Sequence, residues 1–109
     1  MTRSEDGPTI HIEGEGRTLA SAEVHPADEG GVAHSALHVE SGQLPKGTRA
    51  RLVDAVLDTP EVKDAHALLA TMPAGDTEMI DRLRERAPHV EPRLAGATKL
   101  VDVRLDPED

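Results

Sequence analysis

The sequence predicts an α+β domain with a mixed, mostly antiparallel sheet and the element order β-β-β-α-β-α-β-β. Three observations predict it. Alternating runs joined by short turns open and close the chain, two segments have the apolar spacing of amphipathic helices, and a continuous apolar run lies between those segments. The length of 109 residues fits one small domain. We expect this domain to span residues 9–105, between a flexible leader at 1–8 and an acidic tail at 106–109.

Three strands are expected before the first helix. Residues 9–13 and 17–25 alternate between polar and apolar positions, and the glycine-bearing segment 14–16 supplies the turn between them. Breakers and acids over residues 26–31 form a loop. A third strand is expected over residues 32–40. Its presumed inner face is Ala33, Ser35, Leu37 and Val39.

The first helix is expected to begin at Thr48, which is a suitable N-cap, and to end at Pro60. Its apolar stripe is Leu52, Val53, Val56 and Leu57. The apolar run over residues 65–72 follows. A run of this kind is typical of a strand that is covered on both faces.

The second helix is expected to begin at Asp76 and to end before Pro88. Its apolar stripe is Met79, Ile80 and Leu83. Its arginines at 82, 84 and 86 are expected to face solvent and to pair with Asp81 and Glu85. Two final strands are expected over residues 90–94 and 98–105, around a turn at 95–97.

Composition removes several classes of function. The chain has no Phe, Tyr, Trp or Cys, so it offers no ring for base stacking and no thiolate for nucleophilic or metal chemistry. A net charge of −9 argues against nucleic acid and against anionic membrane surfaces. No apolar run approaches the roughly 20 residues that span a bilayer. We therefore expect a cytoplasmic protein without nucleic-acid or membrane partners. Because the core is small, we expect a homodimer or a larger protein partner.

Six histidines raise the question of a metal site. His34 and His38 would lie on one face of a strand, with Glu40 two residues further on. Four residues of strand separate these histidines by about 13 Å, which is too far for two nitrogens on one ion. His66 lies inside an apolar run and is expected in the core or an interface. No metal is expected.

The segment Gly47 to Leu57, with Lys46 before it, resembles the glycine-bearing loop and helix of GNAT-type N-acetyltransferases. A second stretch, from Leu68 to Met72 and on to Leu83, is similar to the strand and helix that follow in that family. The resemblance covers roughly residues 17–105 and implies a GNAT-like half with two helices. In the family, amides at the helix start hold the pyrophosphate of acetyl-CoA, in keeping with the attraction of helix N-termini for phosphate. The resemblance therefore implies a cofactor-binding site at Lys46, Gly47, Thr48 and Arg49.

The chain also departs from the family pattern. Arg49 stands where the family has a last glycine or alanine, and the family's tyrosine acid has no counterpart in a chain without Tyr. In the family, two helices precede these first three strands. They also have no counterpart in this sequence. The candidate proton acceptors are Glu23 and Glu40 on strands and His25 before Pro26.

These observations support two functions. The first is a small GNAT-like domain that is catalytically degenerate and still binds acetyl-CoA or another phosphate-bearing ligand. The alternative is a non-catalytic dimerisation or protein-interaction module that does not bind CoA. A plain ferredoxin-like or ACT-like module is a third reading, which the order of the strands would separate from the other two.

Overall fold

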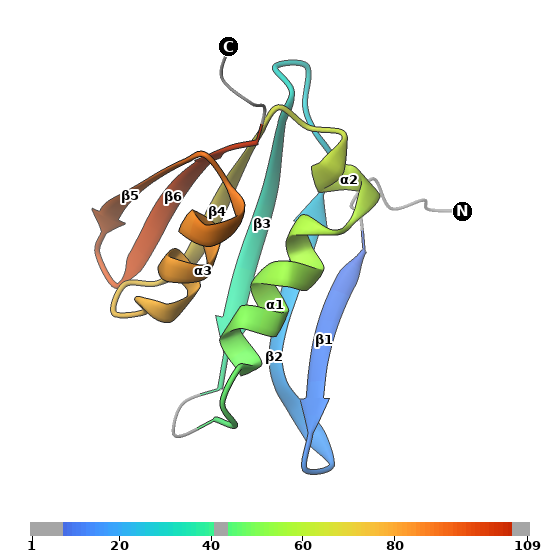
Figure 1. Cartoon of the computed structure of the whole chain (residues 1–109), viewed down its shortest axis with the longest axis vertical. Helices are drawn as coiled ribbons and strands as arrows, with labels where there is room; N and C mark the ends of the chain where they lie inside the picture. The colour runs from blue at the N-terminus through green and yellow to red at the C-terminus, as the bar shows by residue number, and fades with distance from the viewer. Residues whose placement is uncertain (1–7, 41–43, 106–109) are drawn as a thin grey trace.

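The sheet of this protein has six strands in the order β1-β2-β3-β4-β6-β5 (Figure 1). The computed structural model describes residues 8–40 and 44–105, so most of the expected leader and all of the expected acidic tail lie outside it. The strands are β1 (Thr9–Gly14), β2 (Arg17–His25), β3 (Val32–Val39), β4 (Ala67–Pro73), β5 (His89–Ala95) and β6 (Thr98–Arg104). Only β3 and β4, among these strands, pair in parallel. The predicted α+β class and the mostly antiparallel sheet are confirmed.

The helices are α1 (Thr48–Leu57), α2 (Pro60–Lys63) and α3 (Glu78–Arg86). The short α2 is the one element that the sequence did not predict. Pro60 ends α1 as expected, but it also occupies the first position of α2, where its missing N–H costs nothing. Thr59 has an extended backbone and its Oγ1 accepts the Val62 N–H, so it caps this single turn.

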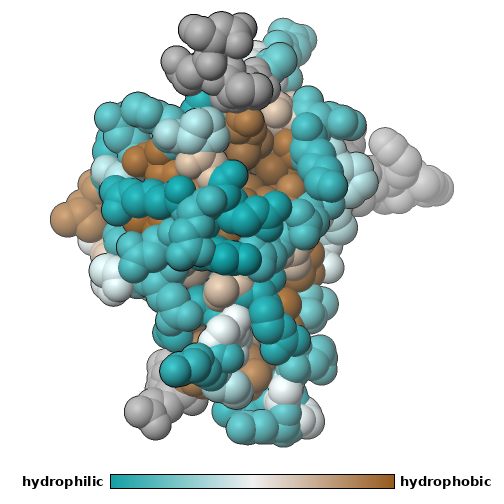
Figure 2. Space-filling model, in the orientation of Figure 1, coloured by the Kyte–Doolittle hydropathy of each residue, from teal (hydrophilic) through white to brown (hydrophobic). Residues whose placement is uncertain are grey.

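All three helices cover the same face of the sheet (Figure 1), and one core lies between them and the strands. The apolar stripe predicted for α1 is buried, as is that of α3. The inner face predicted for β3 is confirmed, with Ala33, Ser35 and Leu37 buried. The outer surface of the helices is largely hydrophilic, and apolar surface shows between α2 and α3 (Figure 2).

The prediction that the fourth strand is covered on both faces is wrong for the single chain. Leu68, Ala70 and Met72 of β4 are buried under the helices. Leu69 and Thr71 point to the other face, which carries no helix from the described part of the chain, and they are only half-buried. The apolar run reflects a parallel strand pair, which is usually covered on both faces.

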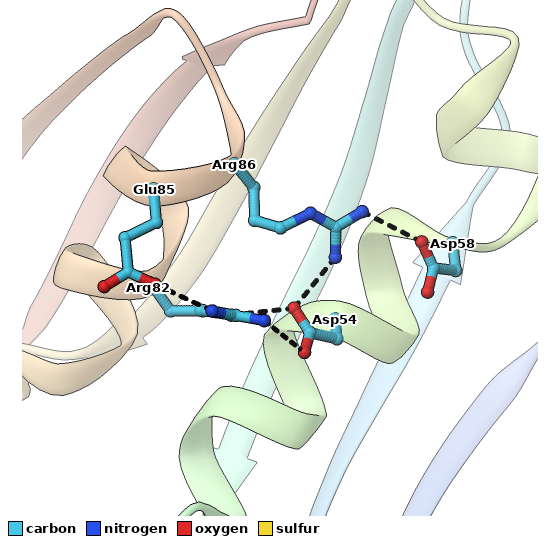
Figure 3. Close-up of polar contacts among 5 residues, drawn as sticks. All are labelled: Asp54, Asp58, Arg82, Glu85 and Arg86. Atoms are coloured by element: carbon cyan, nitrogen blue, oxygen red, sulfur yellow. Dashed lines mark hydrogen bonds and ion pairs between the residues drawn. The ribbon is translucent and has the colours of Figure 1, made fainter.

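Charged side chains join α1 to α3 (Figure 3). The Arg82 guanidinium donates two hydrogen bonds to Asp54, at 2.9 and 2.8 Å, and a third to Glu85 at 2.7 Å. Arg86 donates to Asp54 at 2.8 Å and to Asp58 at 3.0 Å. The expected pairing of Arg82 with Glu85 is confirmed, but its main partner is a carboxylate 28 residues away on another helix. These hydrogen bonds hold the pKa of Asp54 below its ordinary value.

In residues 8–40 and 44–105, no helix is long and apolar enough to cross a membrane.

Candidate functional site

A groove opens where the parallel strands β3 and β4 diverge. Their pairing ends at Ala36 and Thr71, and a cavity of about 280 Å³ begins beyond it. The cavity is lined by residues from both strands and from the β5–β6 turn: Leu37, His38, Val39, Thr71, Met72, Pro73, Ala97 and Thr98. Strands that diverge leave backbone N–H and C=O groups without ladder partners, so the walls can hydrogen-bond an extended ligand. Crevices at the carboxyl ends of parallel strands are common ligand sites.

The N-terminus of α1 follows β3 at this same end of the sheet (Figure 1). Gly47 precedes the helix with φ +86°, a left-handed conformation that strains any residue with a side chain. No heavy atom lies within 4 Å of where its Cβ would be, so the glycine is required by its backbone angle rather than by close packing. The first amides of a helix have no partner within it and carry a partial positive charge. The geometry therefore suits an anion.

Thr48 does not cap α1 as predicted. Gly47 takes the capping position, and Thr48 is the first helical residue, 1% exposed. Its Oγ1 donates to the Pro45 carbonyl at 2.7 Å, so the hydroxyl fixes the loop before the helix and does not face a ligand. Lys46 is exposed in this loop and adds positive charge beside the helix end.

Arg49 joins the start of α1 to the loop between β4 and α3. Its Nε donates to Oδ2 of Asp76 at 2.7 Å, and the side chains are 26% and 3% exposed. The other Asp76 oxygen accepts the Met79 N–H at 3.0 Å, so the Asp76 side chain caps the first turn as predicted, although Thr77 holds the N-cap position of α3. Lys99 is buried and donates from Nζ to the Asp76 carbonyl at 2.7 Å. A second cavity of about 190 Å³ lies beside this pair.

Among the candidate proton acceptors, Glu23 contacts a residue of the groove wall. It is on β2, and its Oε2 is 3.7 Å from Nε2 of His38, which lines the groove. The sequence did not single out His38 as a proton acceptor. The sequence feature that could have indicated His38 is its position near the end of the third strand, on the face opposite Leu37.

Glu40 and His25 are not among the residues that line the groove. Glu40 follows β3, forms an ion pair with Arg17 and lines a neighbouring cavity of about 310 Å³ that shares His38 and Val39 with the groove. His25 pairs in register with His34, near the start of β3, whereas the groove lies at its end. The described residues contain no cluster of three or more His, Asp or Glu that could hold a metal ion. His34 and His38 lie on one strand, as the metal argument assumed.

The fold matches solved structures of acetyltransferases. Ribosomal-protein-alanine N-acetyltransferase of Brucella melitensis aligns with 88% of this chain at 19% identity and a TM-score of 0.59, over 66% of its own length. A putative acetyltransferase of Salmonella typhimurium, solved with acetyl-CoA, aligns with 93% at 16% identity and a TM-score of 0.60, over 66% of its length. Diaminobutyrate acetyltransferase of Paenibacillus lautus, in complex with its substrate and coenzyme A, aligns with 93% at 10% identity and a TM-score of 0.65, over 72% of its length.

These similarities establish a GNAT-type fold, and the strand order follows the pattern of that fold. The ferredoxin-like and ACT-like reading is thereby set aside. The chain spans about two-thirds of the length of the structures that it matches. No protein-family model matches the sequence, and no curated protein matches it.

Proposed function

We propose that this domain binds acetyl-CoA or another CoA thioester, and that it transfers the acyl group slowly or not at all. One observation carries the binding proposal: the groove between β3 and β4 opens at the same end of the sheet as the N-terminus of α1. A pantetheine arm is narrow and extended and carries amides. It matches a groove whose walls are two diverging strand edges.

The phosphates of the ligand would lie at the start of α1. The amides of Arg49 and Ala50 are first-turn donors, and the exposed Lys46 adds an ammonium group. The bound thioester would supply an activated acyl group. Solved structures of this fold with acetyl-CoA or coenzyme A bound support the same class of ligand.

Weak transfer is proposed from the missing acid-base groups. The chain has no Tyr and no Cys, so neither can protonate a leaving thiolate. His38 beside Glu23 remains as a proton acceptor on the groove wall. An imidazole oriented by a carboxylate can accept the proton of an amine, but it supplies only one of the two proton transfers.

A second candidate function is favoured by the Arg49–Asp76 pair. A carboxylate that is 3% exposed stands beside the helix end where the pyrophosphate would bind, and it occupies the guanidinium that would meet the phosphate. In this alternative the domain is a protein-interaction module and does not bind CoA.

Calorimetric titration of the whole chain with acetyl-CoA separates the two functions. We expect a micromolar Kd, and we expect Gly47→Asp to abolish binding because it places a negative charge at the phosphate position. Gly16→Asp is the matched control: Gly16 has φ +78° in the β1–β2 turn, so the strain and charge change are alike. No heat at millimolar acetyl-CoA, or equal loss of binding in both variants, would reject the proposed site.

A further inference from the structure

The face of the sheet that the helices leave uncovered has an apolar centre. We call it the open face and define it by two rows of residues that pair across the strands. The first row runs from β2 to β5 as His25, His34, Leu69, Asp102 and Glu91. Leu69 is half-buried at its middle. Histidines stand on one side of it and carboxylates on the other.

The second row lies two residues further along each strand, on the same face. It reads Glu23, Ala36, Thr71, Leu100 and Arg93. Ala36, Thr71 and Leu100 are half-buried, and the charged ends have opposite signs. In both rows, therefore, each residue on one side of β4 is matched by a chemically complementary residue at the same distance on the other side.

We propose that the open face binds a second copy of this chain, related by a two-fold axis that runs along β4. Such an axis keeps each row against the same row of the second copy and exchanges its two halves. Leu69 then meets Leu69, and Thr71 meets Thr71. In the first row His34 faces Asp102 of the second copy.

The ends of the rows are matched as well. His25 faces Glu91 of the second copy, and Glu23 faces its Arg93. In the second row Ala36 meets Leu100, a small residue against a large one. A two-fold interface must be self-complementary, and these rows satisfy that requirement at each position.

Charged groups of the open face already have partners within the chain, at the surface. Arg93 lies 3.1 Å from Asp102, and His38 lies 3.7 Å from Glu23. All four side chains are more than half exposed, and exposed pairs contribute little to stability. In the dimer Arg93 would lie between its own Asp102 and Glu23 of the second copy. His34, which lies 3.6 Å from Asp28 in the single chain, would also face Asp102 of the second copy.

The size of the face sets the expected affinity. Four strand spacings and two residue rises make the two rows roughly 20 by 7 Å. This is smaller than the usual specific interface, so we expect a weak dimer that dissociates at high micromolar concentrations. The dimer also covers the second face of β4, and the apolar run in the sequence predicts a strand that is covered on both faces.

Sedimentation equilibrium without CoA tests the proposal, from roughly 10 µM to about 1 mM protein. We expect the mass to rise from 11.6 kDa toward twice that value. Glu23→Arg and Arg93→Glu should each be monomeric, because each places like charges opposite one another twice. An equimolar mixture of the two variants should dimerise, because every facing pair is then opposite in sign.

This rescue cannot arise within one chain, since three strands separate β2 from β5. Arg84→Glu on α3 makes the same charge change away from the open face and should leave the dimer intact. Glu91→Lys, on the exposed strand β5, gives a second variant that should weaken the dimer several-fold, and circular dichroism checks each fold. A wild-type mass of 11.6 kDa throughout, dimeric single variants, or a monomeric mixture would each overturn the proposal.

Discussion

Arg49 and Asp76 lie 27 residues apart in sequence and are joined by a 2.7 Å hydrogen bond beside the cavity of about 190 Å³ at the start of α1. The bond links the first turn of α1 to the loop before α3. The carboxylate is almost fully buried, whereas the guanidinium is one-quarter exposed. Asp76 therefore sets the electrostatic potential at the end of α1, and it reduces the attraction of that end for phosphate.

Replacing Asp76 by Asn should tighten the binding of acetyl-CoA. The variant removes one buried negative charge and releases Arg49 toward the ligand, and an asparagine oxygen still caps α3 at the Met79 N–H. We expect about a tenfold lower Kd, which corresponds to ~1.4 kcal/mol, by calorimetric titration. Asp58→Asn makes the same charge change at an exposed carboxylate at the C-terminal end of α1 and should leave the Kd unchanged. Equal or weaker binding by the Asp76 variant would show that this pair does not oppose the ligand.

The strands and the two longer helices could be predicted because their signals are local. Alternation fixed the inner face of β3, and the stripe Leu52, Val53, Val56 and Leu57 fixed that of α1. Gly47 also indicated a backbone conformation that favours glycine, although the capping position is held by Gly47 and not by Thr48. Patterns of this kind depend on nearest neighbours along the chain.

The side-chain partners could not be predicted, since they depend on tertiary packing. The sequence predicts that Arg82 pairs with neighbours on its own helix, yet Asp54 of α1 accepts two of its hydrogen bonds. His38 meets Glu23 because β2 and β3 pair in a register that the sequence does not specify. The groove itself depends on where the pairing of β3 and β4 ends, and no local pattern marks that point.

Gly31 is expected to be the least replaceable of the turn glycines with positive φ. Its φ is +81°, and a Cβ there would lie 2.5 Å from Cδ2 of His66. The Gly31 carbonyl also accepts the His66 N–H at 2.8 Å, so the two backbones cannot separate easily. We expect Gly31→Ala to lower the free energy of unfolding by at least ~2 kcal/mol in urea denaturation.

Gly16→Ala separates strain from steric conflict. Gly16 has φ +78° with no heavy atom near an added Cβ. The substitution Gly16→Ala should therefore lower the free energy of unfolding by about 1 kcal/mol, from backbone strain alone. In a His66→Ala background, the cost of Gly31→Ala should fall to the same value. If the two glycine variants lower the free energy of unfolding equally in the wild-type background, the contact with His66 does not contribute to the effect of Gly31→Ala.

Asp54 makes the packing of α1 against α3 sensitive to acid. Hydrogen bonds from Arg82, and then from Arg86, lower its pKa in the folded state below the ordinary 3.8. A lowered folded pKa contributes stability that is fully present above pH ~4 and is lost as the pH falls through the folded pKa. The arginines stay charged throughout this range.

In urea denaturation from neutral pH to about pH 2.5, Asp54→Asn should therefore be less stable than the wild type at neutral pH, and the difference should shrink below pH ~4. Asp58→Asn, which removes the negative charge from one exposed pair with Arg86, should show a much smaller difference at neutral pH. A gap between wild type and Asp54→Asn that stays constant down to the lowest pH would mean that the carboxylate stabilises the helix pair through packing and not through its charge.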